Sequence, residues 1–169
     1  MKLEIGGGTR NVAGYINLDQ CESADIRHDL NVFPWPIADD SVNEVYSSHC
    51  LEHVHSPNLF LAEICRIGRL EASVIIRVPD AMSESAMVPG HTCVMGEVAF
   101  RNLLQHFPEM FPHPTHILAI EGINRRSDVT WFPRARSSRL FQHYSDEEIM
   151  MWVPRTCHEI EVLLRVKAR

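Results

Sequence analysis

The spacing of apolar and polar residues predicts several short strands in the N-terminal half of the chain. Alternating or β-branched runs at 2–5, 15–18 and 42–47 are typical of strands, and a shorter one is expected within 24–30. Residues 72–79, ASVIIRVP, form an apolar run of strand length. Such a run is typical of a strand that is buried on both faces.

The same half of the chain contains one well-defined helix, predicted over residues 56–68. Ser56 is a good N-cap and Pro57 suits the first helical position. Apolar residues recur at helical spacing and form a stripe on one face. Gly68 is placed to end the helix. Strands joined partly by helices indicate an α/β fold, Rossmann-like, with a mostly parallel sheet.

The C-terminal half carries weaker signals. A helix is predicted over 96–106 and a second, with Ser145 as its cap, over 145–153. A strand is expected at 115–123, and the alternating run at 158–168 predicts a final antiparallel strand. No repeat or linker interrupts the chain, so residues 1–169 are predicted to form a single domain.

The connection between the first two strands is unusually short. Only about eight residues, 7–14, separate them, whereas a parallel crossover with a helix needs roughly 10–12. The first crossover helix is therefore predicted to be shortened or absent. A pyrophosphate ligand favours the N-terminus of such a helix, so the short connection favours a ligand without phosphate.

The first strand runs straight into three glycines, in the sequence KLEIGGG. Glycine permits positive φ and lets a ligand approach the backbone closely, although a plain surface turn has the same composition. In parallel sheets, ligands bind beyond the carboxyl ends of the strands. The glycines lie at one such end, and Asp19, Asp29 and Ser47–His49 lie at others.

Composition narrows the function classes. The net charge of −6 over 169 residues argues against a protein whose main task is to bind nucleic acid. No apolar run approaches the roughly 20 residues of a membrane span, and the N-terminus does not resemble a signal peptide. The five cysteines are scattered without a CxxC pair. They are expected to be free thiols in a reducing compartment, which predicts a cytoplasmic protein.

Several polar residues at the strand ends have two interpretations. Asp19 suits an acid that accepts hydrogen bonds from ribose hydroxyls, or a turn-forming Asp after a strand. Asp29 with Leu30 suits an adenine contact, or a loop cap. His91 suits a general base near neutral pH, or an exposed loop histidine. His49, His53 and His55 match no common zinc motif, so no metal is predicted.

Three stretches, in this order, resemble a known family: KLEIGGGTRNVAGYINLDQ, DLNVFPWPIADDSVNEVYSSHCLEHV and EICRIGRLEASVIIRVPDA. They look like a small class I S-adenosylmethionine-dependent methyltransferase of the "methyltransferase domain 11" kind. The resemblance covers about residues 2–80, extends loosely over 90–104 and does not cover 107–157. GRLEAS stands where the family usually has a Pro-Gly-Gly turn.

The resemblance implies S-adenosylmethionine, or the product S-adenosylhomocysteine, as the bound cofactor. It assigns roles by position. The methionine end is implied for Glu4, Gly6, Gly7, Gly8, Ser47, Ser48 and His49, the ribose for Asp19, and the adenine for Asp29 and Leu30. Glu52 and His53 match the LEH signature and are expected on the acceptor side, and His91 matches a loop histidine.

The chemistry of methyl transfer requires mainly alignment, because the sulfonium is already a good methyl donor. A hydroxyl acceptor also needs a base, and His49 and His91 are the candidates. The Pro-Pro-aromatic tetrapeptide and the Pro-Cys dipeptide of common DNA methyltransferases are absent. The acceptor is therefore expected to be a sugar hydroxyl or another small anionic molecule.

Positive charge concentrates in residues 121–139, which carry five Arg against one Glu and one Asp. Arg125, Arg126 and Arg134 are predicted to bind the anionic acceptor, since Arg suits bidentate contacts. A solvated loop or a contact within a homodimer explains the same charge. The surrounding segment 107–140 lies outside the resemblance and is expected to be a substrate-side insertion.

Two other functions fit the same sequence. One is a non-catalytic domain that binds S-adenosylmethionine and acts as a regulatory or assembly module. The other is a nucleotide-sugar or dinucleotide enzyme of similar architecture. Binding of S-adenosylmethionine against NAD separates these classes.

Overall fold

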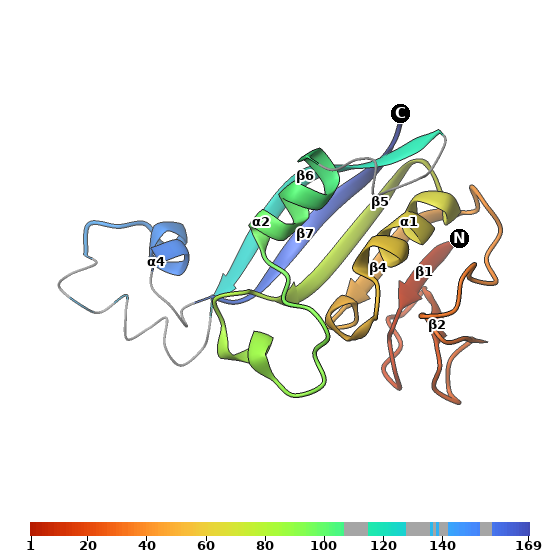
Figure 1. Cartoon of the computed structure of the whole chain (residues 1–169), viewed down its shortest axis with the longest axis horizontal. Helices are drawn as coiled ribbons and strands as arrows, with labels where there is room; N and C mark the ends of the chain where they lie inside the picture. The colour runs from red at the N-terminus through yellow and green to blue at the C-terminus, as the bar shows by residue number, and fades with distance from the viewer. Residues whose placement is uncertain (107–114, 128–135, 137, 139–141, 153–156) are drawn as a thin grey trace.

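A seven-stranded sheet organises the chain (Figure 1). The computed structural model describes residues 1–169 except 107–114, 128–135, 137, 139–141 and 153–156. The strands are β1 (Lys2–Ile5), β2 (Ile16–Asp19), β3 (Ile26–Arg27), β4 (Val42–Ser48), β5 (Gly68–Pro79), β6 (His116–Ser127) and β7 (Cys157–Ala168). The helices are α1 (Pro57–Ile67), α2 (Glu97–Arg101) and α4 (Asp146–Trp152), with the short turns η1 (Leu51–His53), η2 (Glu84–Met87) and η3 (Asn102–His106).

The strand order is β3-β2-β1-β4-β5-β7-β6. Strands β1 to β5 pair in parallel, and β7 runs antiparallel to both β5 and β6. This confirms the predicted Rossmann-like α/β sheet with an antiparallel C-terminal strand. Residues 6–15 contain turns and no helix. The first crossover helix is thus absent, as the short connection predicted.

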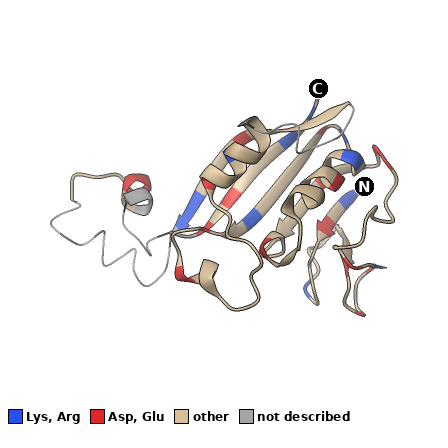
Figure 2. Ribbon diagram, in the orientation of Figure 1, with Lys and Arg blue, Asp and Glu red and all other residues tan. Residues whose placement is uncertain are grey.

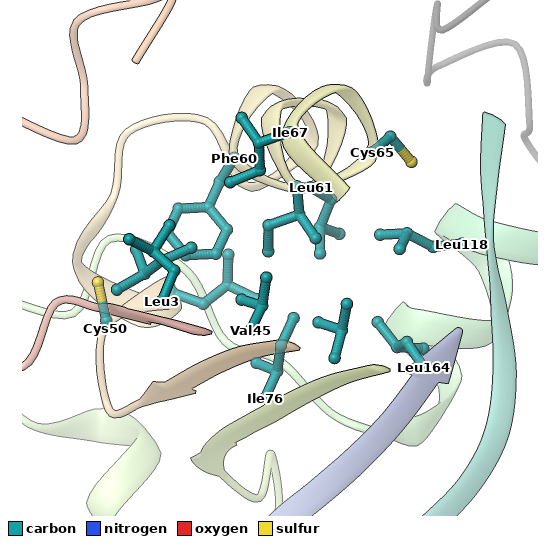
Figure 3. Close-up of a cluster of buried hydrophobic side chains, with 14 of the residues drawn as sticks. Leu3, Val45, Cys50, Phe60, Leu61, Cys65, Ile67, Ile76, Leu118 and Leu164 are labelled. Atoms are coloured by element: carbon teal, nitrogen blue, oxygen red, sulfur yellow. The ribbon is translucent and has the colours of Figure 1, made fainter. Parts of the chain in front are cut away.

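Helix α1 covers one face of the sheet and forms the core with it. Ser56 Oγ accepts a hydrogen bond from Leu59 N at 3.4 Å, which confirms the predicted N-cap. Figure 3 shows Phe60 and Leu61 of the helix above Val45, Ile76 and Leu164 of the strands. All five side chains are buried, so the apolar stripe read from the sequence is the face that meets the sheet.

Gly68 follows α1 as predicted, but the reason for a glycine at this position differs from the predicted one. Its φ of −75° is open to any residue, and the chain passes directly into β5. A Cβ at this position would lie 2.7 Å from Val166 Cγ2 and 2.8 Å from Ile64 O. The glycine is therefore required by the close approach of β7 to the helix end rather than by a left-handed cap.

Strand β5 was expected to be buried on both faces, and this expectation is wrong. Val74, Ile76 and Val78 are buried, whereas Ser73 and Arg77 on the opposite face are only partly buried. Arg77 Nε donates to Glu161 Oε2 at 2.7 Å across the sheet. Figure 2 shows charged segments along β5, β6 and β7. Cross-strand ion pairs therefore occupy part of the face that was expected to be buried and apolar.

The C-terminal elements differ in extent from the prediction. The helix expected over 96–106 is α2 followed by η3, a turn of π-helix. The strand expected at 115–123 is the longer β6, which pairs along β7. This part of segment 107–140 belongs to the sheet itself, while most of its remainder lies outside the described residues. In the described part of the chain, no helix is long and apolar enough to cross a membrane.

Candidate functional site

The glycine loop lies where the strand order reverses direction. Strand β1 pairs in parallel with β2 on one side and with β4 on the other. Successive connections therefore leave in opposite directions, and a crevice opens beyond the carboxyl ends of β1 and β4. Gly6–Gly8 follow β1, and Ser48 and His49 stand at the end of β4. The three consecutive glycines, which have the greatest backbone freedom, therefore lie at the topological switch point.

Side chains of β1 and β2 hold the glycine loop in place. Gly7 N donates to Asn17 Oδ1 at 3.2 Å, and Asn17 Nδ2 donates to Gly8 O at 3.0 Å. Glu4 is buried, and its Oε2 accepts from Val12 N at 2.8 Å. Asn17 was not predicted as a site residue, although its position as a polar residue inside the apolar strand YINL was a usable signal. These bonds pre-form the loop without a ligand.

The glycines are required for different reasons. Gly6 has φ +73°, and a Cβ there would lie 2.2 Å from Cys50 Sγ. A Cβ on Gly7 would lie 2.8 Å from Glu4 Cδ. Gly8 has φ +58°, but a Cβ on it would enter open space. Gly6 and Gly7 thus allow packing within the protein, whereas the space beside the Cα of Gly8 is open.

Two cavities flank this loop. The first, of ≈ 160 Å³, is lined by Asp19, Gln20, Asp29, Leu30, Asn31, Cys50, His53 and Val54. The second, of ≈ 490 Å³, is lined by Gly7, Gly8, Thr9, Arg10, Tyr46, Ser48 and His49. The residues predicted to contact adenine and ribose gather in the first. Most of those predicted to contact the methionine end gather in the second.

Asp19 and Asp29 make the first cavity acidic. Asp19 Oδ2 accepts from Gly8 N at 2.9 Å, and Oδ1 accepts from Cys21 N at 2.8 Å. A hydrogen bond from Asn31 N at 2.9 Å is the main cause that lowers the pKa of Asp29, so this carboxyl is ionised at neutral pH. Each carboxylate oxygen has a second lone pair. Both acids can therefore accept further hydrogen bonds from a ligand.

The second cavity contains two of the three predicted residues after β4. Ser48 and His49 line it, whereas Ser47 is fully buried and donates from Oγ to Ile5 O at 3.0 Å. Ser47 thus ties β4 to β1. The alternation of side chains along a strand was a usable signal here, because Ser47 shares the buried face of Val45.

His49 lies between two carboxylates. Its Nε2 is 2.9 Å from Glu159 Oε2, and its Nδ1 is 3.3 Å from Glu52 Oε1. Its φ is +52°, an uncommon conformation for a residue with a side chain. Interaction with Glu52 is the main cause that raises the pKa of His49, and Glu159 adds to it. The imidazole is thus a stronger base than a free histidine and is more often protonated at pH 7.

Glu52, His53 and His91 form a separate cluster beside the first cavity. His53 lines that cavity, and His91 is not among the residues that line either of the two. The two imidazole rings meet edge to face with centroids 4.7 Å apart. Glu52 is 2% exposed. Among the predicted bases, the structure therefore places His49 in a cavity wall and His91 behind His53.

The predicted acceptor arginines meet carboxylates of the chain itself. Arg125 is largely buried and forms an ion pair with Glu97. Arg126 Nη1 lies 3.0 Å from Glu159 Oε1, on the edge of the sheet. Arg134 lies outside the described residues. Binding of an anionic acceptor by these arginines stays a prediction, and for Arg125 it requires displacement of Glu97.

No family model and no curated protein sequence matches the chain. Solved structures do match its fold. One match is a chain from a Haloferax volcanii complex between the Trm112 methyltransferase activator and a protein described as a methyltransferase. The alignment has 15% identity and a TM-score of 0.64, and it covers 98% of this chain and 82% of that one. A Mesorhizobium loti S-adenosylmethionine-dependent methyltransferase aligns with 12% identity and a TM-score of 0.61, covering 97% and 89%.

A third solved structure has a different activity. The [4+2]-cyclase SpnF aligns with 12% identity and a TM-score of 0.60, covering 97% of this chain and 73% of its own. At these identities the comparisons establish the fold, which is that of class I S-adenosylmethionine-dependent methyltransferases. They do not fix the reaction, because fold and chemistry vary independently.

Proposed function

We propose that the protein binds S-adenosylmethionine across the two cavities and transfers its methyl group to a small acceptor. One observation carries the proposal: at the switch point of a methyltransferase-type sheet, the glycine loop lines the second cavity and is hydrogen-bonded, through Gly8 N, to Asp19 of the first. The first cavity suits the adenosine part, and the second suits the amino-acid end. Gly8, whose Cα side is open, lines the second cavity, and its N–H donates to Asp19 of the first.

The residues present fit this cofactor. Asp19 and Asp29 offer acceptors to ribose hydroxyls and to an adenine amino group, and Leu30 offers an apolar contact for the ring. The positive charges of the cofactor, on sulfur and on its amino group, lie at the end assigned to the second cavity, so the two acids of the first cavity serve as hydrogen-bond acceptors. It has no phosphate, so the missing helix after β1 removes nothing that its binding requires.

When bound, the cofactor supplies an electrophilic methyl group on a sulfonium. The chain then has to align an acceptor and remove its proton. His49 is the candidate base because it lines the second cavity. Its two ring nitrogens face Glu52 and Glu159, so it can take the acceptor's proton only when it is neutral and has turned away from one of these carboxylates. The acceptor class that we favour is a hydroxyl of a sugar or of another small anionic molecule.

Titration calorimetry tests cofactor binding directly. Asp19→Asn should weaken S-adenosylhomocysteine binding by about 1.5–3 kcal/mol, the range for a hydrogen bond to a charged group. Glu22→Gln provides the matched control, because Glu22 is exposed and lines neither cavity. NAD should not bind. Equal affinities for the two variants would remove Asp19 from the site.

Transfer itself needs a second assay. Incubation with methyl-labelled S-adenosylmethionine and pools of saccharides or phosphorylated metabolites should label one acceptor, and His49→Gln should lower kcat with little change in cofactor affinity. If the protein binds the cofactor but labels no pool, the non-catalytic binding module becomes the better account.

A further inference from the structure

A buried carboxylate without hydrogen bonds lies beside the proposed cofactor site. Both oxygens of Glu52 lack a hydrogen-bond partner in the described part of the chain, and the residue is 2% exposed. The nearest cation is His49, whose Nδ1 is 3.3 Å from Oε1. A buried carboxylate that is not hydrogen-bonded costs several kcal/mol or loses its charge. A carboxylate in this environment is expected to bind a ligand.

Two histidines face this carboxylate. One donor atom each of Glu52, His53 and His91 lies within 4.8 Å of the other two. His53 belongs to the turn η1 (Leu51–His53), and His91 belongs to the loop after η2. Two distant segments of the chain therefore deliver three metal-ligating side chains to one point.

Within the described residues, one nitrogen of each of the two imidazole rings has a hydrogen-bond partner. His53 Nδ1 lies 3.2 Å from Gly90 O, and His91 Nδ1 lies 3.3 Å from Ala86 O. A carbonyl oxygen only accepts, so each Nδ1 carries the proton and each Nε2 keeps its lone pair. Metal-ligating histidines usually donate their other ring N–H to a carbonyl or carboxylate in this way.

The backbone also fixes the two segments to each other. Thr92 N donates to Glu52 O at 2.7 Å, and Thr92 Oγ1 donates to Val54 O at 2.6 Å. The loop that carries His91 is thus pinned to the turn that carries Glu52 and His53. Three ligands about 2.1 Å from one ion in a tetrahedral arrangement are roughly 3.4 Å apart. The ligand atoms, within 4.8 Å of one another, would have to approach by up to roughly 1.4 Å to hold an ion.

From these contacts we infer that Glu52, His53 and His91 bind a divalent first-row transition metal ion. Two imidazoles and one carboxylate suit Zn²⁺, Fe²⁺ or Mn²⁺, whereas Mg²⁺ and Ca²⁺ prefer oxygen ligands alone. Three protein ligands leave coordination positions open, as in catalytic sites. If the proposed function holds, an acceptor hydroxyl can occupy an open position and lose its proton more easily. The metal site itself does not depend on that function.

The test uses untagged, chelator-treated protein and the metal alone. Calorimetry should show one Zn²⁺ per chain and no binding of Mg²⁺, and Co²⁺ should give visible absorption bands. Glu52→Gln, which keeps the side-chain shape, and His91→Ala should each weaken Zn²⁺ binding at least tenfold. His55→Ala is the matched control, since this exposed histidine of the same segment lies outside the cluster.

Two results would overturn the inference. One is the absence of stoichiometric Zn²⁺ binding by the wild-type protein. The other is equal Zn²⁺ affinity in wild type, Glu52→Gln and His91→Ala, which would assign the metal to other histidines. Circular dichroism of each variant separates loss of the site from loss of the fold. Neither outcome bears on S-adenosylhomocysteine binding, which the Asp19→Asn experiment tests separately.

Discussion

Individual residues of the glycine loop serve packing and access in different ways. Gly6 is closed in by Cys50 on the inside, and Gly8 faces open space, although both have positive φ. The pattern GGG predicts only that the backbone is permissive there. Which glycine packs against a side chain depends on Cys50, which is 44 positions beyond Gly6 in the chain.

This difference predicts unequal costs for two similar substitutions. Gly8→Ala should lower the free energy of unfolding by about 1–2 kcal/mol, the cost of a left-handed conformation for a residue with a Cβ. Gly6→Ala should cost about 3 kcal/mol or more, because overpacking against Cys50 adds roughly 1–3 kcal/mol. Urea unfolding of both variants measures the difference. Equal costs would mean that Cys50 yields easily.

At the scale of elements, local signals predicted the bounds and the buried face of helix α1. They did not predict that the loop before β4 contributes to the core. Residues 33–41 read as a polar, proline-rich loop, yet Trp35 is buried against Phe60 with ring centroids 5.2 Å apart. Trp35 N donates to Glu63 Oε2 at 2.7 Å, and Trp35 Nε1 donates to Leu30 O at 3.2 Å. Caps and periodicity are local, but these contacts join distant segments and leave no local pattern.

The buried tryptophan predicts that this loop contributes to the core. Trp35→Ala should lower the free energy of unfolding by about 3–5 kcal/mol. Val32→Ala in the same segment should change it by less than about 0.5 kcal/mol, because Val32 is 54% exposed. Chemical denaturation compares them. A small loss for Trp35→Ala would show that the loop is only loosely attached.

The junction of α2 and β6 predicts a pH-dependent contribution to stability. Hydrogen bonds from Arg101 first, and then from Arg125, lower the pKa of Glu97 from its ordinary value of 4.5. These pairs should stabilise the protein by about 1 kcal/mol at pH 7, a modest figure because they are partly exposed. Since the folded-state pKa is the lower one, this contribution is complete above pH 4.5 and is lost as the pH falls through the folded value.

Unfolding of wild type and Glu97→Gln between pH 3 and 7 tests this sign. The difference between them should be largest at neutral pH and shrink below about pH 4.5. Glu22→Gln, an exposed change that also removes one charge, should show no comparable trend. A difference that grows toward acid would contradict the assignment.

For the whole molecule, the sequence predicted the sheet and the strand ends that carry the candidate residues. It predicted less well which of these residues line the cavities. The sequence predicted a largely parallel sheet with candidate residues at the strand ends, and the strand order confirms that sheet and places β1 between β2 and β4. Ser47 was misplaced because alternate residues of a strand face opposite sides. The cluster of Glu52 with His91 could not be predicted, because His91 reaches it through a loop whose path depends on backbone bonds to η1.

The central claim is that the two cavities beside the glycine loop form one cofactor site. The most direct measurement is a crystal structure of the protein with S-adenosylhomocysteine. The account predicts density across both cavities, with ribose hydroxyls at hydrogen-bond distance from Asp19, adenine beside Asp29 and Leu30, and the amino-acid end near Gly8 and Ser48. Ligand bound elsewhere, or cavities that stay empty at saturating S-adenosylhomocysteine, would contradict it.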